Sequence, residues 1–196
     1  MHFSEQMSEQ MIEQSSARVA QWYDFVTERL GREPRGFCDV SDFNDEGLPA
    51  VIRVSSVVDE KPFPTLFWLI DAGISLKIDR LEAAGWIAKL QQDVNESEAI
   101  KKEMRLAHNV HNRLRDVFLT KAEIALLTSR GMMSALSNRG IGGIQEPDRI
   151  RCLHTWYAAH MVEPNCIGGA IDQLMESTEC FEWRLLQSSR FQPNRV

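Results

Sequence analysis

The side chains best suited to chemistry in this chain of 196 residues are concentrated between Arg139 and Gly169. Two glycine-containing loops, at residues 140–143 and 166–169, flank a segment that carries Cys152 and two of the five histidines. Cysteine and histidine are metal ligands and, when paired, a nucleophile and its base. A glycine loop that leads into a helix offers N–H groups and a dipole to an anion. These features indicate where a site for an anion, a metal ion or a reactive thiol would lie.

The segment between the two loops is predicted to be a helix over residues 147–163. Pro147 suits the first helical position, since its missing N–H would have no intrahelical partner there. Pro164 ends the helix, because the residue before a proline avoids the α region. Placing the side chains at about 100° per residue puts four of them on one flank. They are Arg149, Cys152, Trp156 and His160. We expect this flank to line a cavity.

The first hypothesis is that this cavity binds a small anionic ligand bearing a phosphate or carboxylate group. Gly142 and Gly143 would form its lip, shortly before the helix N-terminus, where free N–H groups favour negative charge. Arg149 on a buried flank would need a charged acceptor, which the ligand would supply. The alternative acceptor is an internal carboxylate, and the candidates for it are Asp148, Glu82 and Glu146.

The second hypothesis is a metal-dependent or thiol-dependent enzyme, because several residues are of types that suit zinc. The candidate catalytic residues are Cys152 and His160, and the candidate metal ligands are His108, His111 and His154. On one regular helix, Cys152 and His154 lie about 200° apart and could not hold one ion. On the same helix, Cys152 and His160 lie about 12 Å apart along the axis. A partner for Cys152 must therefore come from another element.

The positions of two histidines on apolar helix faces predict their environment. His111 and His154 fall on such faces, so we expect them to be the two most buried histidines of the chain. Each should have a hydrogen-bond partner, because an unpaired buried imidazole costs on the order of 1–3 kcal/mol.

The third hypothesis is a non-catalytic interaction or scaffold protein, which an acidic exterior and the absence of a recognised catalytic motif favour. The formal charge of 22 minus 28, or −6, argues against a nucleic-acid partner. The chain has no apolar run long enough for a membrane span and no secretory leader pattern, so we expect a cytoplasmic protein. The four widely spaced cysteines are then expected to be free thiols. They are Cys38, Cys152, Cys166 and Cys180. No cofactor is indicated.

The elements that must position these residues predict an α+β fold. Residues 36–43 and 49–58 alternate between apolar and polar side chains, and residues 65–70 form a short apolar run, so a small antiparallel meander of about three strands is expected. It should pack against a mostly helical bundle. Helical spacing is found at about 11–30, 73–92, 97–118, 121–129, from 167 and at 180–186. Capping boxes are expected at Asn95–Glu98 and Thr120–Glu123. Residues 1–16 should be flexible and residues 17–190 should form one domain.

Several stretches together resemble an uncharacterised bacterial family, the domain of unknown function 501. They are Gly31–Gly36, Pro62–Leu69, Arg80–Glu82, Ala107–His108, Gly142–Gly143, Pro147–His154, Ala159–His160 and Pro164–Asn165. The resemblance covers about residues 31–170 and implies no activity. Its arginines Arg35 and Arg80 would add guanidinium groups to an anion site. The family pattern often has a cysteine near the first hairpin turn, where this chain has Phe43 and Asn44. This departure argues against a metal site that needs a hairpin thiolate.

Overall fold

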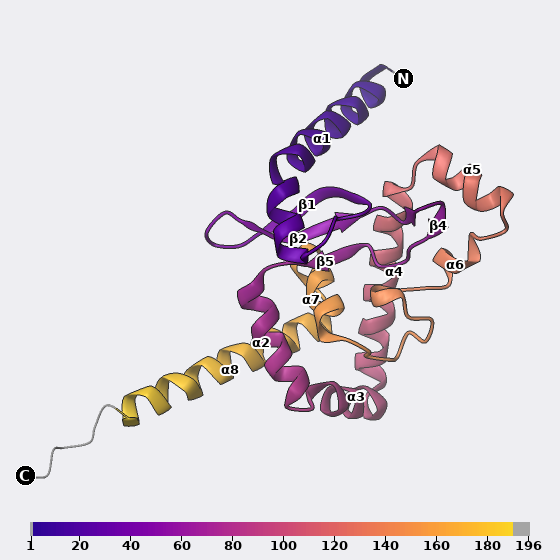
Figure 1. Ribbon diagram of the computed structural model, residues 1–196. Helices are drawn as coiled ribbons and strands as arrows, with labels where there is room; N and C mark the ends of the chain where they lie inside the picture. Colours follow the sequence, from indigo (N-terminus) through magenta and orange to yellow (C-terminus); the bar gives the residue numbers. More distant parts are fainter. Residues whose placement is uncertain (1, 190–196) are drawn as a thin grey trace, which may run out of the picture.

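The computed structural model describes the backbone of residues 2–189 and the side chains of residues 14–177 (Figure 1). Its main sheet has three antiparallel strands in the order β1-β2-β5, and a second sheet pairs β3 with β4. The strands are β1 (Phe37–Phe43), β2 (Pro49–Val54), β3 (Val57–Val58), β4 (Lys61–Pro62) and β5 (Phe67–Leu69). The expected α+β class and the small antiparallel meander are confirmed.

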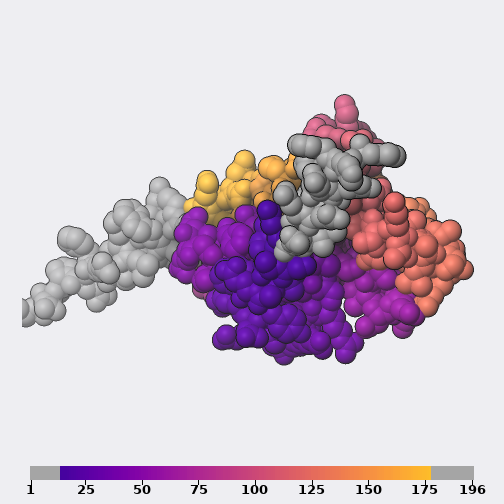
Figure 2. Space-filling view, turned by 90° about the horizontal axis from the view of Figure 1, so that it is seen from above, coloured from indigo at the N-terminus to yellow at the C-terminus, as the bar shows by residue number. Residues whose placement is uncertain are grey.

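The main sheet lies between two groups of helices. Alternation along β2 sends Ile52 toward Val26 of helix α1 (His2–Leu30), and Val51 toward the core that contains helix α7 (Leu153–Val162). Figure 1 shows α1 and α7 on either side of the sheet. In Figure 2 the side chains of α1 and the first hairpin, in indigo to purple, lie together, and those of α4 to α6 lie beside them in pink and salmon. Helix α7 contributes more of its residues to the larger core than to solvent, and we describe it as the centre of that core.

The remaining described helices follow most of the predicted periodicity. They are α2 (Ala72–Ala83), α3 (Trp86–Glu96), α4 (Glu98–Phe118), α5 (Lys121–Ser129), α6 (Ser134–Ser137) and α8 (Cys166–Ser189), with a 3₁₀ turn η1 (Ile141–Gly143). The two helices expected from 167 and at 180–186 are one continuous helix, α8. The single helix expected at 73–92 is two helices, because Gly85 adopts φ +81°, which interrupts the helix and changes the direction of the chain (Figure 1). The N-cap of α4 is Ser97 rather than Asn95. The capping box of Thr120 and Glu123 is confirmed.

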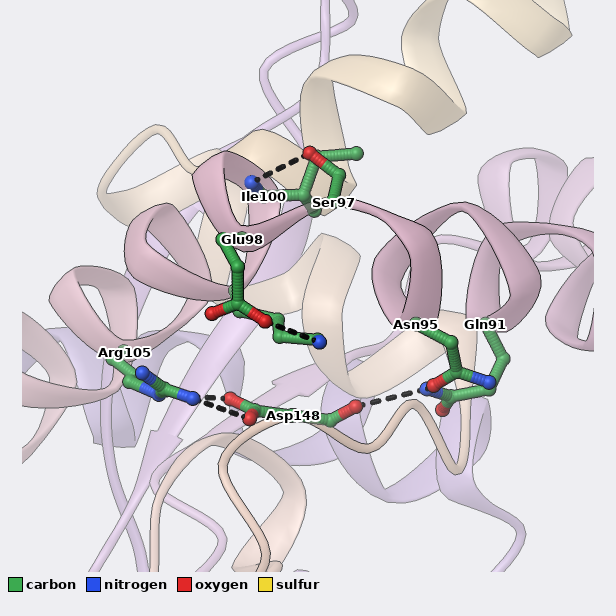
Figure 3. A network of polar contacts seen from close by, with 8 residues as sticks. Gln91, Asn95, Ser97, Glu98, Ile100, Arg105 and Asp148 are labelled. Carbon is green, nitrogen blue, oxygen red and sulfur yellow. Dashed lines mark hydrogen bonds and ion pairs between the residues drawn. The ribbon is translucent and has the colours of Figure 1, made fainter.

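The helix predicted for residues 147–163 begins only at Leu153, so this prediction is wrong for its first six residues. Figure 3 shows one reason: the Gln91 side-chain amide donates to the Asp148 carbonyl at 2.9 Å. The oxygen of the same amide accepts from Ile150 N–H at 2.9 Å. The Asp148 carboxylate accepts two hydrogen bonds from the Arg105 guanidinium, at 2.6 and 3.0 Å. The bonds from Gln91 of α3 satisfy backbone groups of Asp148 and Ile150, in a segment of turn and irregular structure, so this stretch does not need helical hydrogen bonds there.

The most buried histidines among the described residues are His108 and His111, so the prediction for His154 is wrong and that for His111 is confirmed. His154 is about a quarter exposed, because it lies in the first turn of α7 at the edge of the domain. His108 accepts from Ile141 N–H and faces the Pro147 carbonyl, both at 3.0 Å. His111 has no hydrogen-bond partner on either ring nitrogen among the described side chains, against expectation.

Two further expectations concern the thiols and the termini. Cys38, Cys152 and Cys166 are free thiols, and the side chain of Cys180 lies outside the described residues. The backbone is helical from His2, so the flexibility expected of residues 1–16 stays a prediction. Within residues 2–189, no helix combines the length and the hydrophobicity that crossing a bilayer requires.

Acid should destabilise this fold through His108 and His111. Burial lowers the pKa of both rings, that of His111 to about 3, so below pH 6.5 the unfolded chain binds protons that the folded chain does not. Stability is therefore fully present above that pH. We expect the free energy of unfolding to fall between pH 6 and 5 by up to about 1.4 kcal/mol per pH unit for each ring. Urea titrations at several pH values measure this.

The same titrations have an internal control. The pKa of His154 is raised to about 9, chiefly by its hydrogen bond with Cys152, so this ring is protonated in both states at pH 5–6 and adds no slope there. A His111→Phe variant should lose about half of the slope. An unfolding free energy that stays constant from pH 6 to 5 would contradict the burial of these two rings as neutral groups.

Candidate functional site

Three metal-ligating side chains converge at the N-terminus of α7. Glu82 from α2, Cys152 at the N-cap of α7 and His154 in its first turn each place one ligand atom within 4.8 Å of the other two. The Sγ of Cys152 lies 3.8 Å from Nδ1 of His154. Cys152 has extended backbone angles (φ −155°, ψ 126°), so it does not follow helical spacing. The expectation that Cys152 and His154 could not approach one ion is therefore wrong.

Glu82 has a second role in the same place. Its Oε1 accepts a 2.6 Å hydrogen bond from the N–H of Leu153 and lies 3.4 Å from Nδ1 of His154. A carboxylate at a helix N-terminus is stabilised by the unpaired N–H groups and by the helix dipole. The contact fixes α2 against α7 and holds the carboxylate beside Cys152.

The two nitrogens of the His154 ring face different environments. Nδ1 faces Cys152 and Glu82, whereas Nε2 lies 3.3 Å from the Ser75 carbonyl and 3.3 Å from Oδ1 of Asp79. The carbonyl and the carboxylate are acceptors, so Nε2 carries hydrogen. Hydrogen bonding and charge from Cys152, then charge and hydrogen bonding from Glu82, raise the pKa of His154 to about 9 against the effect of burial. The surroundings of this ring thus favour a positive charge.

The separations within the cluster suit a tetrahedral metal ion. With zinc bond lengths of about 2.3 Å to sulfur and about 2.0–2.2 Å to nitrogen and oxygen, neighbouring ligand atoms lie roughly 3.4–3.6 Å apart. The cluster has 3.4 Å between nitrogen and oxygen and 3.8 Å between sulfur and nitrogen. The sulfur and the carboxylate oxygen lie within 4.8 Å of each other.

The four residues expected on one helical flank do not form one cavity wall. Arg149 precedes α7, its side chain is exposed, and its Nε lies 3.8 Å from Glu146, which is one of the internal carboxylates considered from the sequence. Trp156 is buried against the ring of His108, with centroids 4.9 Å apart. Only Cys152 is part of the cluster with His154. The extended segment before Leu153 is the physical reason, because it removes Arg149 and Cys152 from the helical register.

His160 joins α7 to α8. Its Nδ1 accepts from Asn165 N–H at 2.9 Å, so Nε2 carries the hydrogen that it donates to Asp172 at 3.0 Å. The hydroxyl of Tyr157 donates to the other oxygen of Asp172 at 2.7 Å. Both ring nitrogens of His160 are thus engaged in a link between two core helices, away from Cys152.

The remaining predicted site residues lie in structural positions. Gly142 and Gly143 have positive φ values, and a Cβ on Gly142 would lie 2.7 Å from Thr155, so the lip predicted from the sequence is a tight turn packed on α7. Arg35 pairs with Asp59 at 3.1 Å on the surface. Arg80 is an exposed residue of α2 outside the cluster.

The sequence does not indicate Glu82 as a candidate ligand, nor Ser75 and Asp79 as neighbours of His154. From the sequence, Glu82 is expected only as a partner for arginine, and it lies in the stretch Arg80–Glu82 that carries the family resemblance. More than 70 residues separate it from His154, and nothing local in the sequence shows that they meet.

Comparison with known proteins agrees with that resemblance. A family model described as Protein of unknown function (DUF501) matches residues 40–173, about two thirds of the chain and all of the Glu82, Cys152 and His154 cluster. No curated protein and no solved structure matches the chain.

The contact of His160 with α8 predicts opposite effects at two adjacent glycines. A Cβ at Gly168 would overlap the imidazole of His160, whereas a Cβ at Gly169 would meet nothing within 4 Å. We expect Gly168→Ala to lower the free energy of unfolding by about 1–3 kcal/mol through overpacking. Gly169→Ala should raise it by about 0.5–1 kcal/mol, because alanine restricts the unfolded chain. Urea denaturation compares the two, and equal effects would exclude the tight contact.

Proposed function

The chain belongs to the DUF501 family of proteins of unknown function, and from this premise we propose that it binds a divalent metal ion, zinc by preference, at Glu82, Cys152 and His154. The observation that carries the proposal is the orientation of His154. One nitrogen faces a thiol and a carboxylate, and the other faces Ser75 and Asp79. Histidines that bind metals almost always donate their second N–H to a carbonyl or carboxylate in this way.

The donor set favours zinc over the hard cations. Magnesium and calcium prefer oxygen ligands, whereas a thiol with an imidazole and one carboxylate suits zinc. Three protein ligands leave a fourth position of the tetrahedron for water or a substrate, which is the arrangement of catalytic rather than structural zinc sites. An ion there would lower the pKa of such a water, and the half-buried position of Cys152 and His154 leaves the cluster within reach of solvent.

The anionic-ligand hypothesis has less support. The N–H of Leu153 at the start of α7 already bonds to the Glu82 carboxylate, which occupies the place of an anion. Arg149 is exposed and faces Glu146. The scaffold hypothesis stays a prediction, as does the cytoplasmic location.

A reactive thiol is the second candidate, supported by one observation. The sulfur of Cys152 lies 3.8 Å from Nδ1 of His154, and Nε2 of that ring lies 3.3 Å from Asp79. In this arrangement Cys152 would be the nucleophile, His154 its base, and Asp79 the carboxylate that orients the ring. The same cysteine would be the metal ligand, so alkylation of Cys152 that proceeds equally with and without zinc would favour this candidate.

Zinc binding tests the main proposal directly. We expect the metal-free chain to bind one zinc ion through this cluster, and cobalt to give a thiolate charge-transfer band. At a free zinc concentration of 100 times Kd, the folded state should gain about 2.7 kcal/mol. Cys152→Ser and His154→Gln should weaken binding by more than the roughly 10–100-fold expected for the supporting Asp79→Asn. Isothermal titration calorimetry and cobalt spectra measure these effects.

Two controls make the result specific. Cys38→Ser changes a half-buried thiol outside the cluster and should keep wild-type affinity. Glu82→Gln keeps an acceptor for Leu153 N–H and so separates loss of the ligand from loss of the cap. The proposal fails if zinc neither binds at micromolar concentrations nor depends on Cys152.

A further inference from the structure

The segment that precedes α7 is held in place by side chains of α3 and α4. Gln91 of α3 donates to the Asp148 carbonyl and accepts from Ile150 N–H, both at 2.9 Å. Arg105 of α4 donates to both carboxylate oxygens of Asp148, so that Asp148 lies between Arg105 and Gln91 (Figure 3). We call residues 147–152 the linker segment. Its conformation depends on side chains that lie 43 to 59 positions away in the sequence.

The two hydrogen bonds of Gln91 oppose a helix in the linker segment. In a longer α7 that included this segment, the N–H of Cys152 would donate to the Asp148 carbonyl, four residues earlier. The N–H of Ile150 would donate in the same way to the Glu146 carbonyl. The Gln91 amide takes one partner from each of these bonds, because it donates to the Asp148 carbonyl and accepts from Ile150 N–H. It therefore competes directly with helix formation.

The three residues of the proposed metal site converge only while α7 begins at Leu153. In the longer helix, Cys152 and His154 would lie about 200° apart around the axis, whereas Sγ now lies 3.8 Å from Nδ1. The N–H of Leu153, which now donates to Glu82 at 2.6 Å, would donate to the Arg149 carbonyl instead. The longer helix would thus lose both contacts that bring the three residues together.

The sequence of the linker segment favours the longer helix. Pro147 suits the first position of a helix, and residues 148–152 include neither glycine nor proline. Tertiary contacts must therefore outweigh a local preference. Part of their contribution is independent of Gln91, because the Ile150 side chain is 4% exposed and belongs to the larger core. Loss of Gln91 should therefore shift the linker segment toward helix without unfolding the domain.

We propose that Gln91 is a positioning residue of the metal site, which keeps Glu82, Cys152 and His154 together by holding the linker segment out of the helix. The inference rests on the proposed zinc binding. Gln91 is not one of the three clustered residues, and it acts on them through the backbone of the linker segment. When only a fraction of the molecules has the ligands together, the apparent dissociation constant rises in inverse proportion to that fraction. Gln91 thus sets the affinity of the site from another helix.

The experiment compares zinc binding and backbone conformation in the full chain. Gln91→Met keeps the length of the side chain and removes its amide. We expect zinc to bind this variant roughly tenfold more weakly by isothermal titration calorimetry, the scale for loss of a residue that orients a ligand. In the metal-free, isotope-labelled variant, the backbone carbon signals of residues 148–152 should move toward helical values, and saturating zinc should return them. A residue that only stabilised the fold would leave these signals unchanged.

The chain offers a matched control in the next residue. Gln92 is exposed on the same helix and its amide bonds to Glu96 rather than to the linker segment. Gln92→Met should therefore keep the zinc affinity and the carbon signals of the wild type.

A second variant keeps the test decisive if Gln91→Met does not fold. Arg105→Met removes the contact with Asp148 from a half-exposed position, and it should weaken zinc binding by up to about fivefold and shift the same carbon signals by less.

The outcomes separate this inference from the proposed function. If wild type binds zinc and Gln91→Met binds it as tightly, or if the carbon signals of the variant do not move, the inference is overturned and the metal site stands. If wild type binds no zinc, the proposed function fails. The carbon signals of the metal-free chains then decide separately whether Gln91 keeps Cys152 out of the helix.

Discussion

The hydrogen bond from Leu153 N–H to the Glu82 carboxylate is the contact on which the arrangement of this domain depends. Helix α7 is the centre of the larger core, and its N-terminus would otherwise lie half-buried with unpaired N–H groups. A carboxylate from α2 meets that need and at the same time stands beside Cys152 and His154. The same group that starts the helix thus also brings three potential ligands together. Local stability and the proposed chemistry are linked through one side chain.

Elements with a strong local pattern could be predicted from the sequence, and elements that depend on a distant side chain could not. The strand at β2 and the box of Thr120 and Glu123 depend on neighbouring residues, and both are confirmed, although β2 is buried on both faces instead of alternating. The non-helical stretch before α7 depends on Gln91. Its side-chain amide makes the hydrogen bonds with the Asp148 carbonyl and the Ile150 N–H that a neighbouring strand would otherwise make. Proline at position 147 favours a helix start locally, and tertiary hydrogen bonds override that preference.

The candidate site shows the same limit. The sequence indicates Cys152 and His154 as candidate site residues, and a regular helix would hold them apart, whereas the extended backbone of Cys152 brings its sulfur within 3.8 Å of the ring. Nothing in the sequence placed Glu82 or Asp79 near them. Conversely, His160 had the residue type of a catalytic group, but its two nitrogens are engaged by Asp172 and by a backbone N–H. Residue type shows what a side chain is able to do, and only the partners show whether it is available.

Two histidines of the core each lie against a glycine that has no room for a side chain. A Cβ at Gly140 would overlap the ring of His108, and one at Gly168 would overlap that of His160. Each ring also bonds to the backbone close to its glycine, at Ile141 and Asn165. Each histidine and the glycine that it contacts are therefore expected to vary together in evolution. Among related chains, a larger residue at position 140 or 168 becomes tolerable only after the facing ring has been lost, so substitutions at the two positions of a pair should occur together.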